Sequence, residues 1–219
     1  MIKSREVPTE LRQFNSVFNS LIYRHDVSQI FRDFLEIVIC CLGHGTQEKT
    51  YFEVINRYNR EELENFSRLF GELMVFYSKN TAENSWCDPL GTYYELLAGN
   101  YKKSAFGQFF TPKALCDLMV QMTMEKQNFG ITVNEPACGS GRLVMAANAF
   151  VRGNKYICQD MDDICCQMTA INLAFHKVDA VVYCMNSITI DEPRRTYIIN
   201  HELWKHKTIS ILQPNKKSP

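Results

Sequence analysis

A run of small residues that follows a predicted strand constrains the fold of this chain more than any other feature. Residues 134–141 read Asn-Glu-Pro-Ala-Cys-Gly-Ser-Gly, between an apolar strand pattern and a helical pattern. Gly139 and Gly141 have no Cβ, so the backbone can turn tightly there and approach a ligand closely. The carboxylate of Asp160 follows about 20 residues later, after the next predicted strand, which is the spacing of a ribose-binding acid in dinucleotide-type sites. This order predicts a ligand site in an α/β sheet.

The second half of the chain alternates strand and helix patterns. A helix is predicted from residue 111 to about residue 124, with Pro112 at its favoured first position. Strand and helix patterns then alternate in the order β-α-β-α-β, which predicts parallel strands joined by right-handed crossovers. The predicted strands are residues 131–134, 155–158 and 180–184, and the predicted helices between them are residues 141–150 and 162–175.

The first half reads as helical throughout. Apolar residues recur at helical spacing, and they predict helices over residues 11–22, 27–42, 61–77 and 90–98. We therefore expect two domains, a helical one over residues 1–100 and an α/β one over residues 101–219. No Gly-, Ser- or Pro-rich tether separates them, so we expect them to pack against each other.

Composition sets further limits. The net charge is zero, but the first hundred residues carry ten Lys and Arg against fourteen Asp and Glu, so a modest basic excess falls on the second half. The nine cysteines are an odd number with no CxxC pair, which indicates reduced, buried thiols and predicts no metal site. The longest apolar run, residues 37–42, is too short to span a bilayer, and no signal-peptide pattern opens the chain. We expect a cytoplasmic protein.

Two motifs carry a family resemblance. Gly-Gln-Phe-Phe-Thr-Pro at residues 107–112 and Pro-Ala-Cys-Gly-Ser-Gly at residues 136–141 resemble the N6-adenine DNA methyltransferases, in particular the M subunits of type I restriction–modification systems. The resemblance covers residues 90–188. It implies a partial class I S-adenosylmethionine-dependent methyltransferase (Rossmann-like) sheet, preceded by the helical domain and truncated after the third or fourth strand.

The resemblance also implies a cofactor site for S-adenosylmethionine. Thr111 would bond the methionine part, Glu135 would face its ammonium group, Asp160 would accept the ribose hydroxyls, Met161 would pack on the adenine ring and Asn186 would meet the adenine edge. The full set of implied cofactor-binding residues is Gln108, Phe109, Phe110, Thr111, Pro112, Lys113, Glu135, Ala137, Gly139, Ser140, Gly141, Arg142, Asp160, Met161 and Asn186.

Each of these roles has a structural alternative. Thr111 can be a helix cap, Glu135 a solvated turn carboxylate, Met161 a core residue and Asn186 a loop asparagine. Arg142 stands where many family members have a small residue, so its side chain can either crowd the site or pair with Glu135.

The family's catalytic tetrapeptide, Asn/Asp-Pro-Pro-Tyr/Phe, is absent. The chain has seven prolines and no two are adjacent, so we assign no catalytic residue. Only residues 208–212 remain as a strand candidate that could lie beside residues 131–134, followed by Gln-Pro-Asn at residues 213–215. The competing explanation is that a partner chain covers this edge strand, which would otherwise be exposed.

Three functions follow from these observations. The first is a truncated adenine-specific DNA methyltransferase that binds its cofactor, contacts DNA through a partner subunit and has little activity alone. The second is a non-enzymatic, degenerate methyltransferase domain that binds a cofactor or a partner, either a second copy of the chain or a specificity or catalytic subunit. The third is a methyltransferase for a substrate that is not a base. The missing tetrapeptide favours the second over the first for actual activity.

Overall fold

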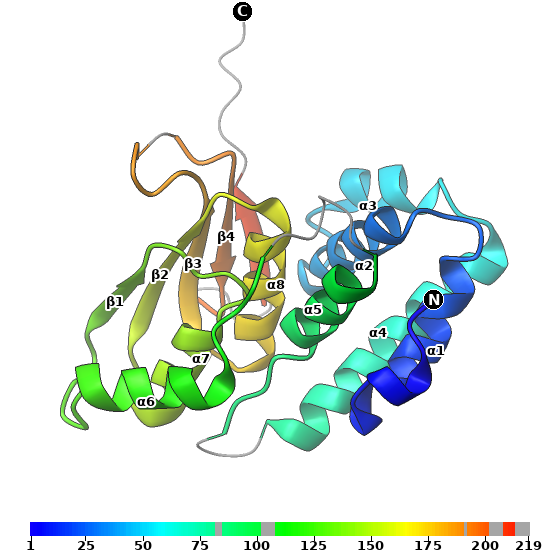
Figure 1. Ribbon diagram of the computed structural model, residues 1–219. Coiled ribbons are helices and arrows are strands. Elements are labelled where there is room, and N and C mark those ends of the chain that lie inside the picture. Colours follow the sequence, from blue (N-terminus) through cyan, green and yellow to red (C-terminus); the bar gives the residue numbers. More distant parts are fainter. Residues whose placement is uncertain (82–84, 102–107, 191, 202–207, 213–219) are drawn as a thin grey trace, which may run out of the picture.

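A computed structural model describes residues 1–81, 85–101, 108–190, 192–201 and 208–212 (Figure 1). Its first part is helical, as the apolar spacing predicts. Two short 3₁₀ turns, η1 (Ser4–Glu6) and η2 (Thr9–Leu11), precede five helices: α1 (Arg12–Leu21), α2 (Val27–Leu42), α3 (Glu48–Ile55), α4 (Arg60–Asn80) and α5 (Pro89–Tyr101). The sequence patterns did not single out α3.

The second part is α/β. The β-α-β-α-β order is observed, with boundaries that differ from the predicted ones by at most two residues. Its elements are α6 (Lys113–Thr123), β1 (Thr132–Glu135), α7 (Arg142–Phe150), β2 (Lys155–Asp160), α8 (Asp163–Phe175), β3 (Asp179–Cys184), β4 (Arg195–Ile199) and β5 (Ile209–Leu212).

Side chains at the helix starts explain several of these boundaries. Asp26 accepts hydrogen bonds from the first backbone amides of α2, and Asp162 does the same for α8. Asn59 and Glu62 form a reciprocal capping box at the start of α4. For α6 the N-cap is Pro112, which has no side-chain cap bond, so Thr111 does not act as the cap and Pro112 precedes the helix instead of opening it.

The five strands lie in the order β1-β2-β3-β4-β5. β1, β2 and β3 are parallel, whereas β4 is antiparallel to β3 and β5 is antiparallel to β4. The prediction that residues 208–212 lie beside residues 131–134 is wrong, because β5 pairs with β4 at the opposite edge. The strand β4 was not predicted. A parallel crossover needs about a dozen residues or more, so the short segment 185–194 turns the chain back beside β3.

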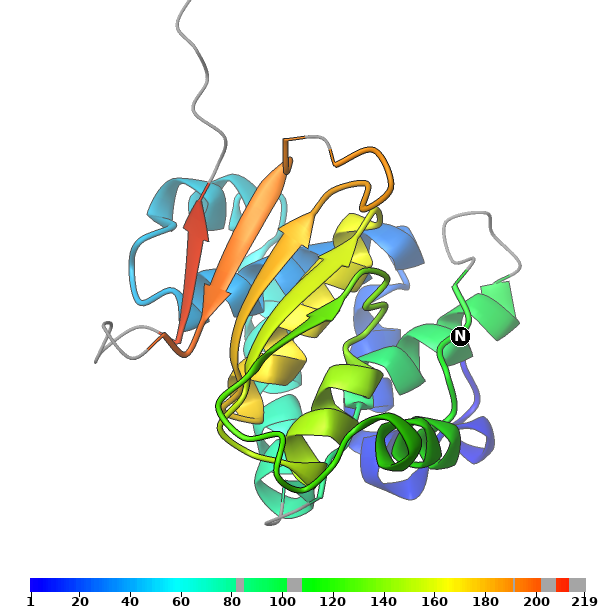
Figure 2. The same cartoon turned by 90° about the vertical axis from the view of Figure 1, so that its left-hand side faces the viewer.

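One face of the sheet is covered by helices. The buried side chains of Tyr156, Cys158, Val182 and Tyr197 point to that face, where α8 packs on β2, β3 and β4. Figure 2 shows the strands toward the viewer with α2 and α8 behind them. On the other face, a row of paired residues is only half-buried: Ile157, Val181 and Ile198.

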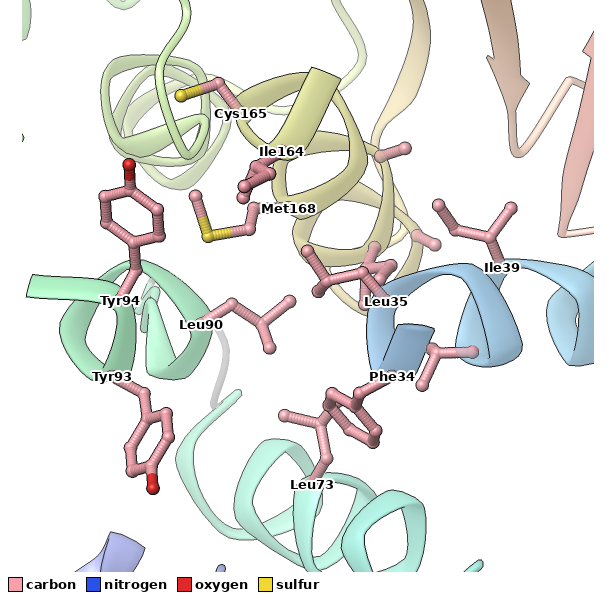
Figure 3. Close-up of a cluster of buried hydrophobic side chains, with 14 of the residues drawn as sticks. Phe34, Leu35, Ile39, Leu73, Leu90, Tyr93, Tyr94, Ile164, Cys165 and Met168 are labelled. Atoms are coloured by element: carbon pink, nitrogen blue, oxygen red, sulfur yellow. The ribbon is translucent and has the colours of Figure 1, made fainter. Parts of the chain in front are cut away.

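The core lies where the helical part meets α8. Figure 3 shows apolar side chains of α2, α4 and α5 converging on Ile164, Cys165 and Met168 of α8. Polar contacts cross the same junction, because Tyr77 of α4 bonds Asn172 and the Gln167 amide donates to Glu36 at 2.6 Å. The two parts therefore pack against each other, as expected from the lack of a tether. A division into two domains near residue 100 stays a prediction.

Most of the cysteines are buried, as the composition predicts. All nine cysteines are free, and seven are buried. Burial raises the pKa of the Cys40 and Cys87 thiols to about 12, so both are protonated and unreactive at neutral pH. In the described parts of the chain, no helix combines the length and the apolar character needed to cross a membrane.

Candidate ligand-binding site

Polar side chains gather where the parallel strands end. Glu135 is the last residue of β1, Asp160 is the last residue of β2, and Asn186 follows β3 by two residues. The register pairs Glu135 with Cys158 and Asp160 with Cys184, so these carboxyl ends lie side by side. Open α/β sheets bind ligands in the crevice outside the carboxyl ends of their strands.

The small-residue turn adopts a backbone that requires glycine. Gly139 has φ +56° and Gly141 has φ +88°, both in the left-handed region that L side chains rarely adopt. The turn is anchored to its surroundings, because the Gly139 amide donates to Asp160 Oδ2 at 2.9 Å and the Gly139 carbonyl accepts from Thr169 Oγ1 at 2.8 Å. Asp160 therefore joins the end of β2 to the turn after β1.

The two carboxylates retain acceptor capacity. Asp160 accepts the backbone amides of Gly139 and Asp162, one on each oxygen, and Glu135 Oε1 accepts the Ala137 amide at 3.2 Å. Each oxygen has a further lone pair. Within the residues that the structure describes, neither carboxylate forms an ion pair. Burial raises the pKa of both groups, and the charge of Asp160 raises that of Glu135 further.

A pH-dependent stability follows from Glu135. Its raised pKa means that the fold opposes its ionisation. The contribution of Glu135 to the free energy of unfolding is therefore fully present below the ordinary pKa of 4.5 and is lost as the pH rises through the raised pKa. We expect Glu135→Gln to raise the melting temperature of the free protein at pH 7.5, with a difference that shrinks toward pH 4.5. Thermal unfolding at both pH values measures this, and Glu10→Gln on the exposed turn η2 is the control. A Glu135→Gln variant that melts at or below the wild-type temperature at pH 7.5 would contradict the expectation.

The Gln-Phe-Phe-Thr-Pro segment lies partly against the turn. The Phe110 ring is close enough that a Cβ added to Gly139 would come within 2.9 Å of Phe110 Cδ1. Phe109, in contrast, is 90% exposed, and Gln108 is exposed as well. Lys113 does not reach the carboxylates, because its ammonium donates to the Trp86 carbonyl at 2.8 Å and lies over the Trp86 ring.

The remaining predicted residues differ in their access to this edge of the sheet. Met161 is 61% exposed beside Asp160, so it is not a core residue. Asn186 is half-buried, and its Oδ1 accepts the Ile188 amide at 3.0 Å. Ala137 is exposed in the turn, while Ser140 is buried and its hydroxyl donates to Asp88 at 2.6 Å.

Arg142 has partners that the sequence analysis missed. Its Nε donates to Asp88 at 2.6 Å and its Nη2 donates to Glu95 at 2.8 Å. Neither alternative considered for Arg142 is observed, since it does not pair with Glu135 and its side chain is buried toward α5. Asp88 and Glu95 belong to the helical part, far from Arg142 in the chain. One sequence signal for a buried partner of Arg142 was available, because this arginine stands in the first turn of a mostly apolar helix, α7.

The fold defines an α/β protein with a partial class I, Rossmann-like sheet, and its candidate ligand site lies at the carboxyl ends of the parallel strands. Residues 85–210, more than half of the chain, match the family model described as N-6 DNA Methylase. The chain belongs to this family, and the resemblance seen in its motifs is confirmed.

Similar proteins include several methyltransferases. The methylase subunit of the type I restriction enzyme MpnII from Mycoplasma pneumoniae is 27% identical over 155 residues, which is 63% of this chain and 28% of that protein. Two solved structures are also similar. A protein from Listeria monocytogenes, described as a candidate class I S-adenosylmethionine-dependent methyltransferase, is 13% identical with a TM-score of 0.49, over 84% of this chain and 54% of that one. A type I restriction–modification system methyltransferase subunit from Streptococcus thermophilus is 21% identical with a TM-score of 0.46, over 82% and 40%. The chain thus spans about a quarter to a half of these relatives.

Proposed function

We propose that this chain is the cofactor-binding part of an N6-adenine-type DNA methyltransferase. It binds S-adenosylmethionine and its demethylated product at the carboxyl edge of β1–β3, and by itself it transfers little or no methyl. The observation that carries the proposal is that Glu135, Asp160 and the Gly139–Gly141 turn meet at one edge of the sheet. Membership of the N-6 DNA methylase family supports it.

The side chains at this site fit the chemical groups of S-adenosylmethionine. Glu135 has no cationic partner among the described residues, so it suits the methionine ammonium group. Asp160 has free lone pairs for two ribose hydroxyls, and exposed Met161 offers an apolar surface to the adenine ring. Asn186 offers amide groups to the adenine edge. The cofactor itself would supply a methyl group activated by a sulfonium.

Substitution of Asp160 tests the proposal. Calorimetric titration with S-adenosylhomocysteine is expected to show saturable binding to the wild type. Asp160→Ala is expected to weaken it by about 1–3 kcal/mol, because buried hydroxyls would lose their acceptor. Asp179→Ala is the matched control. Asp179 is the first residue of β3, so it lies at the amino end of the strands, away from the carboxyl ends where the cofactor would bind. Absence of binding to the wild type at millimolar ligand would refute the proposal.

A partner is the second part of the proposed function. β1 is an edge strand in which Thr132 and Asn134 are exposed, and Ile131 just before it is 41% exposed. An open strand edge presents unpaired backbone groups that can accept another strand. We infer that a segment of a partner subunit pairs with β1, and that DNA is contacted through that partner. The similar proteins from M. pneumoniae and S. thermophilus are themselves subunits.

An exposed edge has a measurable consequence for the isolated chain. We expect it to self-associate at high concentration by pairing of β1 strands, and Thr132→Lys to reduce this association, because charged residues protect edge strands. Light scattering over a concentration series measures the mass, and Thr46→Lys in the turn between α2 and α3 is the control. A monomer at every concentration, or equal association of all three proteins, would show that β1 is not an accessible pairing edge.

A further inference from the structure

The backbone of Phe110 is held by side chains from two other elements. Glu95 of α5 accepts the Phe110 amide on Oε1 at 3.1 Å. Arg142 of α7 donates from Nη1 to the Phe110 carbonyl at 3.4 Å and to the Thr111 carbonyl at 3.3 Å. Glu95 and Arg142 also bind each other at 2.8 Å. Both polar groups of the Phe110 backbone are therefore bonded to one ion pair.

The Phe110 ring is held by the same elements. It lies 5.5 Å from the Tyr94 ring of α5, and the Arg142 guanidinium lies 5.3 Å from its centroid. The third neighbour is Gly139, where even one added carbon would meet the ring. The segment before α6 is thus positioned on the glycine turn by α5 and α7, outside any helix or strand of its own.

Asp88, at the start of α5, holds Arg142 in this place. Its Oδ2 accepts Arg142 Nε and Ser140 Oγ, both at 2.6 Å, and its Oδ1 accepts the Gly91 amide at 2.7 Å and Asn172 Nδ2 at 2.8 Å. A Cβ at Gly91 would lie 2.6 Å from Ser140 Oγ, so a glycine is needed there for α5 to approach the glycine turn so closely. The first turn of α5 is therefore fastened to the glycine turn.

The ion pairs that Arg142 forms with Asp88 and Glu95 are largely shielded from water. The side chain of Arg142 is 10% exposed, that of Asp88 is 3% exposed and that of Glu95 is 32% exposed. Charge-assisted hydrogen bonds shielded from water are stronger and better defined than exposed ones. Glu95 is the member nearest the solvent, so it can be altered with the least loss of stability.

We propose that Glu95 and Arg142 are positioning residues, which clamp the Phe110–Thr111 backbone over the glycine turn and so set the affinity of the cofactor site. The inference rests on the proposed function. It makes the helical part of the chain, through α5, a determinant of cofactor binding, although neither Asp88 nor Glu95 needs to touch the ligand.

The test compares Glu95→Ala with Glu62→Ala. Glu62 lies in the helical part, where it completes the capping box of α4 and bonds His25 at 2.9 Å, far from Phe110 in the chain. Titration with S-adenosylhomocysteine is expected to show about tenfold weaker binding for Glu95→Ala, the equivalent of one lost charge-assisted bond, and unchanged binding for Glu62→Ala. Thermal unfolding of both variants separates this effect from general destabilisation.

A second measurement follows the clamp without any ligand. Hydrogen exchange of the Phe110 amide is expected to accelerate in Glu95→Ala, whereas exchange of the Gly139 amide, which is bonded to Asp160, is expected to stay as in the wild type. Glu95→Gln, which keeps an acceptor oxygen, is expected to restore part of the protection. Tight wild-type binding that Glu95→Ala leaves unchanged would overturn the inference alone. A wild type that binds no S-adenosylhomocysteine would overturn the proposed function, and with it the role assigned to the clamp.

Discussion

Arg142→Met is expected to lower the free energy of unfolding by about 3 kcal/mol, the lower end of the range for breaking one side of a buried ion pair. The reason is that Asp88 stays buried, with a side chain only 3% exposed, and loses its sole cationic partner among the described residues. Asp88 keeps its bonds to Ser140, Gly91 and Asn172, and half-exposed Glu95 can be hydrated, so the upper end of the range is not expected.

Urea unfolding of matched variants measures this effect. Arg60→Met is the control, because Arg60 also pairs with a carboxylate, Glu64, but both side chains are exposed, at 95% and 64%. Exposed pairs contribute about 1 kcal/mol or less, so the control should differ little from the wild type. Adding Asp88→Asn to Arg142→Met should recover part of the loss, since it removes the unpaired charge. Equal stability of the Arg142 and Arg60 variants would show that the buried ion pair does not hold α5 to α7.

The second large expected effect concerns catalysis. The 219-residue chain alone is expected to incorporate no methyl label into adenine in DNA. The adenine amine is a poor nucleophile, and the family positions acceptors for its hydrogens and an aromatic ring for the flipped base. One proton-transfer group alone contributes about 10²–10⁴-fold, and the chain has no adjacent prolines from which such a site could be built.

The position of β5 strengthens this expectation. The Gln-Pro-Asn segment at residues 213–215 lies outside the described residues. The strand β5 lies four strand spacings from β1. At about 4.8 Å per spacing, that is about 19 Å from the β1 edge. Incubation of purified protein with tritiated cofactor and mixed-sequence DNA is the assay, with an intact adenine methyltransferase as positive control. Label above a boiled sample that Asp160→Ala abolishes would show that the chain does build a working site.

Local patterns predicted the frame of the proposed site well. Its three parallel strands, the glycine turn and the acids at the strand ends all arise from residues close together in sequence. Positive φ values at Gly139 and Gly141 are a backbone requirement that the residue types themselves reveal. Strands in β-α-β order must run parallel, so Glu135 and Asp160 necessarily end at the same edge.

The sequence by itself therefore determined the family, the β-α-β-α-β order and the position of Glu135 and Asp160 at the ends of their strands. Only the tertiary structure decided the partners of Arg142 and the place of β5. The Arg142 side chain is long enough to reach several carboxylates, and which of them it meets depends on how α5 packs, about fifty residues away in the chain. The place of β5 follows from the segment 185–194 between β3 and β4, which is too short for a parallel crossover. This segment turns the chain back beside β3, so β4 and then β5 extend the sheet away from β1, and β1 remains an edge strand.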